Sequence, residues 1–197
     1  MIKAIAIVLF LFANSYVNSQ NCQLSMIIDS QGTLEDYIVA NSNCTSVHGD
    51  LVLSNIESLL PLQNIDSIYG SLIIKDSPSL TNLVGLDSLI YVDGLVEIMR
   101  NSNLKSVSNL NNLNTIARNT HEGEFGFCLS IASNETLDSI IGFSNLENVG
   151  LWGIKIFENQ SLKIINGFGK IETIDNLWIE NNPLVHSISI IILSWQF

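Results

Sequence analysis

The chain has 197 residues, enough for one domain with a sizeable core, and its 47 % hydrophobic and 14 % charged content excludes a disordered chain. Its 8 basic and 19 acidic residues give a formal net charge of −11 at pH 7. Such a surface repels phosphate groups, so nucleic acid and anionic lipid are excluded as favoured partners.

The first 19 residues have the pattern of a secretory signal peptide. Lys3 precedes an apolar run from Ala4 to Ala13, and a small residue, Ser19, follows at a typical cleavage distance. The run is too short to span a membrane. We expect cleavage after Ser19 and a secreted or cell-surface protein, with an N-terminal anchor or a buried strand as the alternatives. Residues 20–197 are then one solenoid domain.

The first segment after the signal peptide is expected to cap the solenoid. In an oxidising compartment, Cys22 and Cys44 would form a disulfide that closes a loop over the open end. Thr33 and Asp36 fit a capping box and predict a helix from about Leu34 to Ala40. The third cysteine, Cys128, is expected to face outward, where it is either partly covered by a neighbouring coil or part of an intermolecular disulfide.

The rest of the chain repeats a strand-like unit of alternating apolar residues. Copies begin at Gly49, Gly70, Gly94, Phe127, Trp152 and Asp175, at steps of 21, 24, 33, 25 and 23 residues. Between the units the apolar positions recur at every third residue, as in Leu80, Leu83, Leu86, Leu89 and Val92. Neither a helix nor a strand has this period. Repeats of this length predict a mainly β solenoid, in which stacked coils bury a continuous core.

An asparagine follows the strand unit at the same place in four repeats. These are Asn101, Asn134, Asn159 and Asn182. They predict a ladder of buried side chains bonded to the backbone of adjacent coils. Asn134, Asn159 and, in the cap, Asn43 also lie in glycosylation sequons, and a buried ladder residue cannot carry a glycan. For Asn159 the ladder is favoured, and for Asn134 both interpretations stay open.

The outward strand positions are where a ligand would bind. They form one column that includes Ile73, Lys155 and Trp178 and a second that includes Met99, Phe157 and Glu180. Phe157 and Trp178 are expected about 4.8 Å apart along the axis, beside Lys155 and Glu180. Exposed aromatic residues beside charges are typical of a protein or carbohydrate contact site. The alternative is that the insertion around "ARNTHEGEFGF" or the C-terminal segment folds over them. We take these six residues as candidate ligand-binding residues.

No motif for catalysis, a metal or a cofactor is found. His48, His121 and His186 are isolated, without the spacing of metal ligands, and are expected at the surface or in turns. A polysaccharide-cleaving β-helix would need several carboxylates on one strand face, and the outward strand positions of each coil here hold at most one. We therefore expect a protein that is not an enzyme and needs no cofactor.

The stretch from Asn21 to Leu53, with its cysteine pair and first strand unit, followed by coils such as "GSLIIKDSPSLTNLVGLDSLIYV", resembles the receptor L domain of the epidermal growth factor and insulin receptor ectodomains. The resemblance runs to about Ile188 and implies a right-handed β-solenoid related to leucine-rich repeats, with an extracellular binding role. Nothing encodes a second L domain, a cysteine-rich module or a kinase signature, so growth-factor binding is not carried over.

The last residues begin another coil, with Val185, Ile188 and Ile191 in the period of three, and then end on an apolar run. A fragment of a longer chain, a strand that closes the end, and a degenerate lipid-anchor signal are the three interpretations. The function predicted is a non-catalytic extracellular module that binds a protein or a glycan through its strand face. The alternatives are a structural protein of a cell surface, wall or matrix, and the first lobe of a larger receptor.

Overall fold

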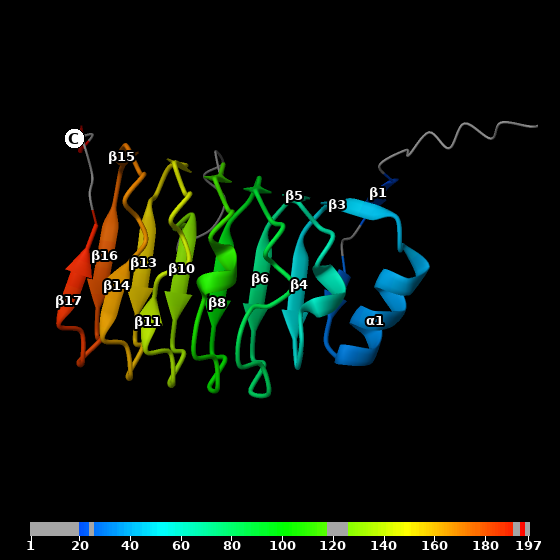
Figure 1. Cartoon of the computed structure of the whole chain (residues 1–197), viewed down its shortest axis with the longest axis horizontal. Coiled ribbons are helices and arrows are strands. Elements are labelled where there is room, and N and C mark those ends of the chain that lie inside the picture. Colours follow the sequence, from blue (N-terminus) through cyan, green and yellow to red (C-terminus); the bar gives the residue numbers. More distant parts are fainter. Residues whose placement is uncertain (1–19, 24–25, 118–125, 191–193, 196–197) are drawn as a thin grey trace, which may run out of the picture.

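The protein is a stack of coils along one long axis. The computed structural model describes residues 20–23, 26–117, 126–190 and 194–195; the predicted signal peptide and His121 lie outside them. Figure 1 shows the helix α1 (Gln31–Ala40) at one end of the stack and β17 (Ser187–Ser189) at the other. This arrangement confirms the predicted β-solenoid.

The largest sheet has seven strands, one from each successive coil. They are β2 (Met26–Ile28), β4 (Leu51–Ser54), β6 (Leu72–Lys75), β8 (Val96–Met99), β10 (Leu129–Ala132), β13 (Ile154–Phe157) and β16 (Leu177–Glu180). Their spatial order follows the chain, and each pair is parallel. Because the register is constant from β4 to β16, equivalent residues of successive coils lie in straight columns.

A second sheet of six parallel strands forms another side of the coils. It contains β1 (Gln20–Gln23), β3 (Cys44–His48), β5 (Ser67–Tyr69), β7 (Tyr91–Val92), β9 (Thr115–Ile116) and β12 (Asn148–Val149), in that order. Shorter pairings complete the coils: β11 (Ser139–Ile140) with β14 (Ile164–Asn166) and β17, and β15 (Thr173–Ile174) with β18 (Ser194–Trp195). Two 3₁₀ turns, η1 (Leu60–Leu62) and η2 (Ser108–Leu110), lie at corners.

The period of three marks the residues that point into the core. In the coil of β6 the residues Leu80, Leu83, Leu86, Leu89 and Val92 are all buried, and the same positions are buried in the coils on either side. Each straight segment between corners therefore contributes one inward side chain, whereas each strand of the large sheet contributes two. Phe143 and Phe168 stack inside the core with their ring centroids 5.2 Å apart.

The predicted asparagine ladder is present at one corner of the coils. The backbone N–H of Asn101 donates to Oδ1 of Asn134 at 3.1 Å, and that of Asn134 donates to Oδ1 of Asn159 at 3.1 Å. Nδ2 of Asn134 donates to the carbonyl of Ile98 at 2.9 Å. Asn182 continues the ladder, and Ser77 replaces asparagine at its other end.

The ladder argues against two of the three candidate glycosylation sites. Asn134 and Asn159 are fully buried, and their Nδ2 atoms, to which a glycan would be attached, donate hydrogen bonds inside the ladder. A glycan on either side chain would require that the ladder hydrogen bonds of its Nδ2 atom be broken. Asn43 lies exposed in the turn between α1 and β3 and stays a candidate.

Backbone geometry explains two repeated sequence features. A Cβ on Gly70 would overlap the backbone of Gly49 in the neighbouring coil, so the unit begins with glycine where two coils meet backbone to backbone. The residue just before each ladder position has a positive φ: Asn55, Asp76, Arg100, Ser133, Glu158 and Asn181 lie between 49° and 57°. Each coil turns the same corner through one left-handed residue.

The N-terminal cap has the expected disulfide, but it also contains strands that were not predicted, and its helix begins three residues earlier than expected. Cys22 and Cys44 are bonded, and they lie on the adjacent strands β1 and β3. The cap segment thus forms a first coil of its own, one coil earlier than Gly49. The helix begins at Gln31, because Oγ of Ser30, not of Thr33, accepts the capping hydrogen bond from the Thr33 N–H at 3.2 Å.

Cys128 is not outward-facing as predicted. It precedes β10, where the backbone is not yet extended, so the strand alternation does not reach it. Its side chain is fully buried, and Sγ donates to the carbonyl of Leu151 at 2.7 Å. An intermolecular disulfide would require this buried sulfur to become exposed.

In the last coil Ile188, predicted to point inward, is 53 % exposed. Within the described residues β17 is the edge strand of its sheet, with β14 as its neighbour, and this leaves the Ile188 side chain about half exposed. Ile191 lies outside the described residues.

Candidate ligand-binding surface

The outward face of the seven-stranded sheet arranges the candidate residues as the sequence predicts. Lys155 lies opposite Trp178, and Phe157 lies opposite Glu180, in the pairing of β13 with β16. The two aromatic residues are therefore on neighbouring strands and staggered by two residues. All four side chains are partly or largely exposed, and Trp178 is 51 % exposed.

These residues form a compact cluster around the Lys155 ammonium, which we call the aromatic cluster: Phe127, Lys155, Phe157, Trp178 and Glu180. Nζ of Lys155 lies 4.6 Å from the ring centroid of Phe157 and 6.0 Å from that of Trp178. The Trp178 indole donates from Nε1 to Oε2 of Glu180 at 2.7 Å. The indole plane is thus fixed by a hydrogen bond at one edge and by contacts with neighbouring rings.

Phe127 is the member of the cluster that sequence reasoning missed. Its ring meets the Trp178 ring edge-on, with centroids 6.2 Å apart and an interplanar angle of 90°, and lies 5.9 Å from Nζ of Lys155. It follows the 33-residue step between strand units, the one that is longer than the others. That extra length was a usable signal, because an insertion next to an exposed aromatic residue is the nearest candidate to pack on it.

The two charged side chains of the cluster, Glu180 and Lys155, have different kinds of partner. The Glu180 carboxylate already accepts the indole hydrogen bond, whereas Lys155 makes no ion pair with any described residue. Lys155 is instead held over aromatic ring faces, an arrangement that keeps the ammonium N–H groups available to a ligand. The cluster therefore offers an apolar ring surface, one free cation and one ordered carboxylate.

The two other candidates lie on the same face but outside the cluster. Met99 is on β8, two strands from Phe157, and Ile73 is on β6, four strands from Trp178. Just beyond the column of Met99, where the strands end at the corner of the sheet, Arg100 forms an ion pair with Asp76 of the neighbouring coil. Hydrogen bonds from this guanidinium hold the pKa of Asp76 below its ordinary value, and the same bonds raise the pKa of Arg100.

The structure describes two of the three histidines. His48 lies on β3, where its ring packs against that of Tyr69 with centroids 4.5 Å apart and a tilt of 31° between the planes, and His186 is exposed. No group of three or more His, Cys, Asp or Glu side chains in the described part of the chain is placed to hold a metal ion. Of the helices described, none has the length and apolar character needed to cross a membrane.

Comparison with known proteins agrees with this architecture. Residues 81–174 match the family model described as Receptor L domain, which assigns this part of the chain to the receptor L-domain family. Receptor L domains are extracellular, non-catalytic binding domains, and the disulfide between Cys22 and Cys44 fits that setting. Neither the curated proteins nor the solved structures contain a significant match.

Proposed function

We propose that this protein is a secreted or cell-surface binding module that recognises a ligand, a protein or a glycan, through the outward face of its seven-stranded sheet, and that it catalyses no reaction. The aromatic cluster carries the proposal. It combines a half-exposed tryptophan in a fixed orientation with a lysine that forms no ion pair with any described residue, both on the outward strand face.

Between the two ligand classes, the strand face favours a protein. The face is long and open, and it combines Trp178, Phe157, Met99 and Arg100 with flanking charges. Tryptophan, other aromatic residues, methionine and arginine are the residues enriched in protein interfaces, and tryptophan is common among those that dominate binding energy.

The structural alternative is less well supported. A wall or matrix protein would be densely glycosylated, and the chain has three sequons, at Asn43, Asn134 and Asn159. The side chains of Asn134 and Asn159 form the hydrogen bonds of the buried ladder. What remains is a single exposed sequon, which does not make a glycan-coated stalk.

The test is to screen the secreted protein against arrays of extracellular proteins and of glycans, in parallel with two variants. Trp178→Ala removes the centre of the aromatic cluster. Tyr69→Ala is the matched control, because Tyr69 is an aromatic residue of similar exposure, 47 %, on the six-stranded sheet. We expect Trp178→Ala to abolish binding and Tyr69→Ala to retain it, with both variants folded. Binding that survives Trp178→Ala would refute the proposed face.

A further inference from the structure

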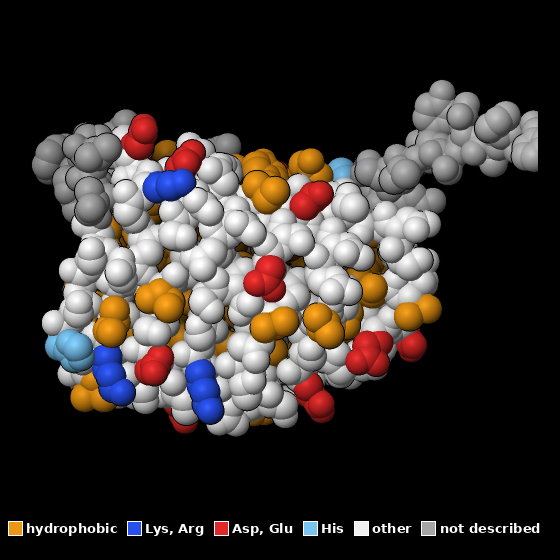
Figure 2. Space-filling model, in the orientation of Figure 1, with side chains coloured by type: hydrophobic (Ala, Val, Ile, Leu, Met, Phe, Trp, Pro, Cys, Tyr) orange, Lys and Arg blue, Asp and Glu red, His pale blue; other side chains and the backbone are white. Residues whose placement is uncertain are grey.

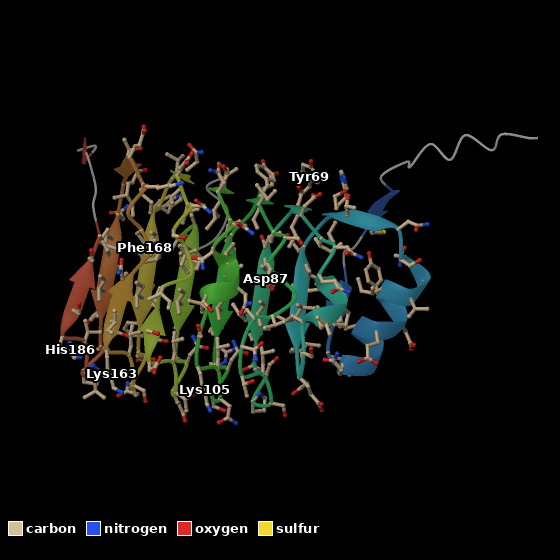
Figure 3. The ribbon with its side chains drawn as sticks, viewed as in Figure 1. Tyr69, Asp87, Lys105, Lys163, Phe168 and His186 are labelled. Atoms are coloured by element: carbon tan, nitrogen blue, oxygen red, sulfur yellow. A yellow bond between two sulfur atoms is a disulfide. The ribbon has the colours of Figure 1, made fainter. Side chains whose placement is uncertain are left out.

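A second surface of the solenoid has an open hollow that the aromatic cluster does not involve. It has a volume of about 570 Å³ and crosses the segments of four successive coils, from Asp66 through Ser88 and Asn112 to Asn145. Four coils span about 14 Å along the axis. Figure 3 labels Asp87, which lines the hollow, at the middle of the viewed face. In Figure 2 the surface around it is mostly uncharged.

The polar groups of the hollow are only partly used by the protein itself. The Asp87 carboxylate accepts hydrogen bonds from Nδ2 of Asn109 at 2.8 Å and from the Gly85 N–H at 3.2 Å. Asp66, which is half-buried, makes no side-chain hydrogen bond or ion pair with the residues that the structure describes. Its carboxylate can therefore accept two donors from a ligand.

The neighbouring amides supply both an acceptor and a donor. Asn112 uses Nδ2 to donate to the Asp87 carbonyl at 2.6 Å, which leaves Oδ1 open. Asn145 uses Oδ1 to accept from Nζ of Lys170 at 2.8 Å, which leaves Nδ2 open. Ser88 donates to the Gln63 carbonyl at 2.7 Å and keeps its oxygen lone pairs. Beside them Ile90 is 51 % exposed and gives the hollow an apolar wall.

We propose that this hollow binds a neutral pyranose sugar, with Asp66 accepting hydrogen bonds from two ring hydroxyls and Ile90 packing on the apolar face of the ring. Hydroxyl groups both donate and accept, so those of two linked pyranose rings, which reach along the roughly 14 Å of the hollow, satisfy the open carboxylate and amide oxygens at one end together with the Asn145 N–H groups at the other. An ammonium or guanidinium group only donates and leaves Asn145 unsatisfied. Two carboxylates in one hollow repel an anionic ligand. The volume is in the range of small-molecule sites.

The experiment is saturation-transfer NMR on the secreted protein with methyl glycosides of glucose, galactose, mannose and N-acetylglucosamine and with their β-linked disaccharides, at millimolar concentrations. Asp66→Asn removes the charged acceptor, and Ile90→Ser removes the apolar wall. Asp36→Asn, an exposed carboxylate on α1, is the matched control. We expect at least one probe to bind, and Asp66→Asn to weaken it by roughly tenfold or more, because a hydrogen bond to a charged group is lost.

Several outcomes would overturn the proposal. They are the absence of saturation transfer from every probe, binding unchanged in both hollow variants, binding that requires calcium and is abolished by EDTA, and binding lost in Trp178→Ala. The last result would indicate that the sugar binds at the aromatic cluster and not in the hollow. Conversely, binding that is lost in Asp66→Asn and retained in Trp178→Ala supports the hollow whatever happens to the proposed function of the strand face.

Discussion

Trp178 and Glu180 lie two residues apart on the same strand, and the indole Nε1 of the first donates to Oε2 of the second at 2.7 Å. Side chains two residues apart point to the same face of a strand, so this bond is local to β16 and requires no other coil. It holds the largest exposed side chain of the strand face in one orientation before any ligand arrives.

Removing this bond should weaken ligand binding without unfolding the protein. In Glu180→Ala the indole side chain is no longer held by this hydrogen bond. A ligand that binds Trp178 must then immobilise the side chain, which makes the free energy of binding less favourable by about 0.5–1.5 kcal/mol. We expect affinity for the strand-face ligand to fall by severalfold. In ¹H–¹⁵N spectra, one indole resonance should shift upfield as its N–H loses the carboxylate. Glu172→Ala, an exposed carboxylate on another segment, is the control, and an equal loss of affinity there would contradict the interpretation.

Breaking the asparagine ladder should destabilise the fold. Asn134→Ala leaves the buried N–H of Asn101 and the carbonyl of Ile98 without these partners, at about 1–3 kcal/mol for each unsatisfied group. Asn103→Ala removes one exposed hydrogen bond, to the Pro78 carbonyl, and should cost well under half as much. Urea unfolding of both variants measures the difference. Equal free energies of unfolding would show that the ladder is not a stabilising element.

Glycosylation should be confined to the cap. Because Asn134 and Asn159 are fully buried in the ladder, we expect the protein secreted from a eukaryotic host to carry an N-glycan on Asn43 and on neither of them. Intact mass before and after enzymatic deglycosylation, followed by peptide mapping, gives the occupied positions. A glycan found on Asn134 in folded protein would contradict the ladder.

The ion pair between Asp76 and Arg100 should make a small, pH-dependent contribution to stability. The pKa of Asp76 is lowered in the folded state, chiefly by its hydrogen bonds from Arg100. The contribution is therefore complete at pH values above the ordinary pKa of 3.8 and is lost as the pH falls through the lower folded-state value. Both side chains are about half exposed, so solvent screening limits it to roughly 0.2–1 kcal/mol. Asp76→Asn should cost that much at neutral pH and nothing in strong acid, as measured by urea unfolding.

The left-handed corner residues should tolerate glycine and reject β-branched side chains. Glu158 has φ of 57° and is exposed, with one side-chain hydrogen bond from Ser133. Glu158→Val should destabilise the fold by about 1–2 kcal/mol, because valine is strongly disfavoured in this region. Glu158→Gly should change stability by less than Glu158→Val, because glycine adopts this φ without strain. Equal melting temperatures of the two variants would show that the corner is not constrained.

Much of this architecture could be predicted from the sequence, because the position of a residue in the repeat determines whether its side chain points into the core or outward. The apolar residues at every third position identify the inward side chains, and the constant strand unit predicts the columns that bring Lys155 beside Trp178. The prediction failed where a residue lies outside the repeated unit. Cys128 precedes its strand and follows no alternation, and the capping oxygen comes from Ser30, three residues ahead of the expected Thr33.

The two candidate sites could be predicted to different extents. The aromatic cluster is built from residues in fixed register, so four of its members were named beforehand, whereas Phe127 enters through an insertion. The hollow around Asp66 is different in kind. Asn109, Lys170 and Gln63 already form hydrogen bonds with residues that line the hollow, and only the remaining polar atoms can bind a ligand. Which atoms remain depends on the positions of the side chains, which the sequence does not give.

Successive coils share the hydrogen bonds of the corner ladder, whereas their outward residues differ from coil to coil. Each coil accepts one backbone N–H bond from its predecessor, and the form of the acceptor is flexible: Oγ of Ser77 accepts from the Ile56 N–H at 3.1 Å where other coils use asparagine. The outward residues Lys75, Phe157 and Glu180 contribute backbone carbonyls to this seam, but no described outward side chain of the large sheet takes part in it. The outward side chains can therefore be substituted one coil at a time without removing any of the hydrogen bonds by which the corner joins one coil to the next, so the surface of the strand face and the stacking of the coils vary independently.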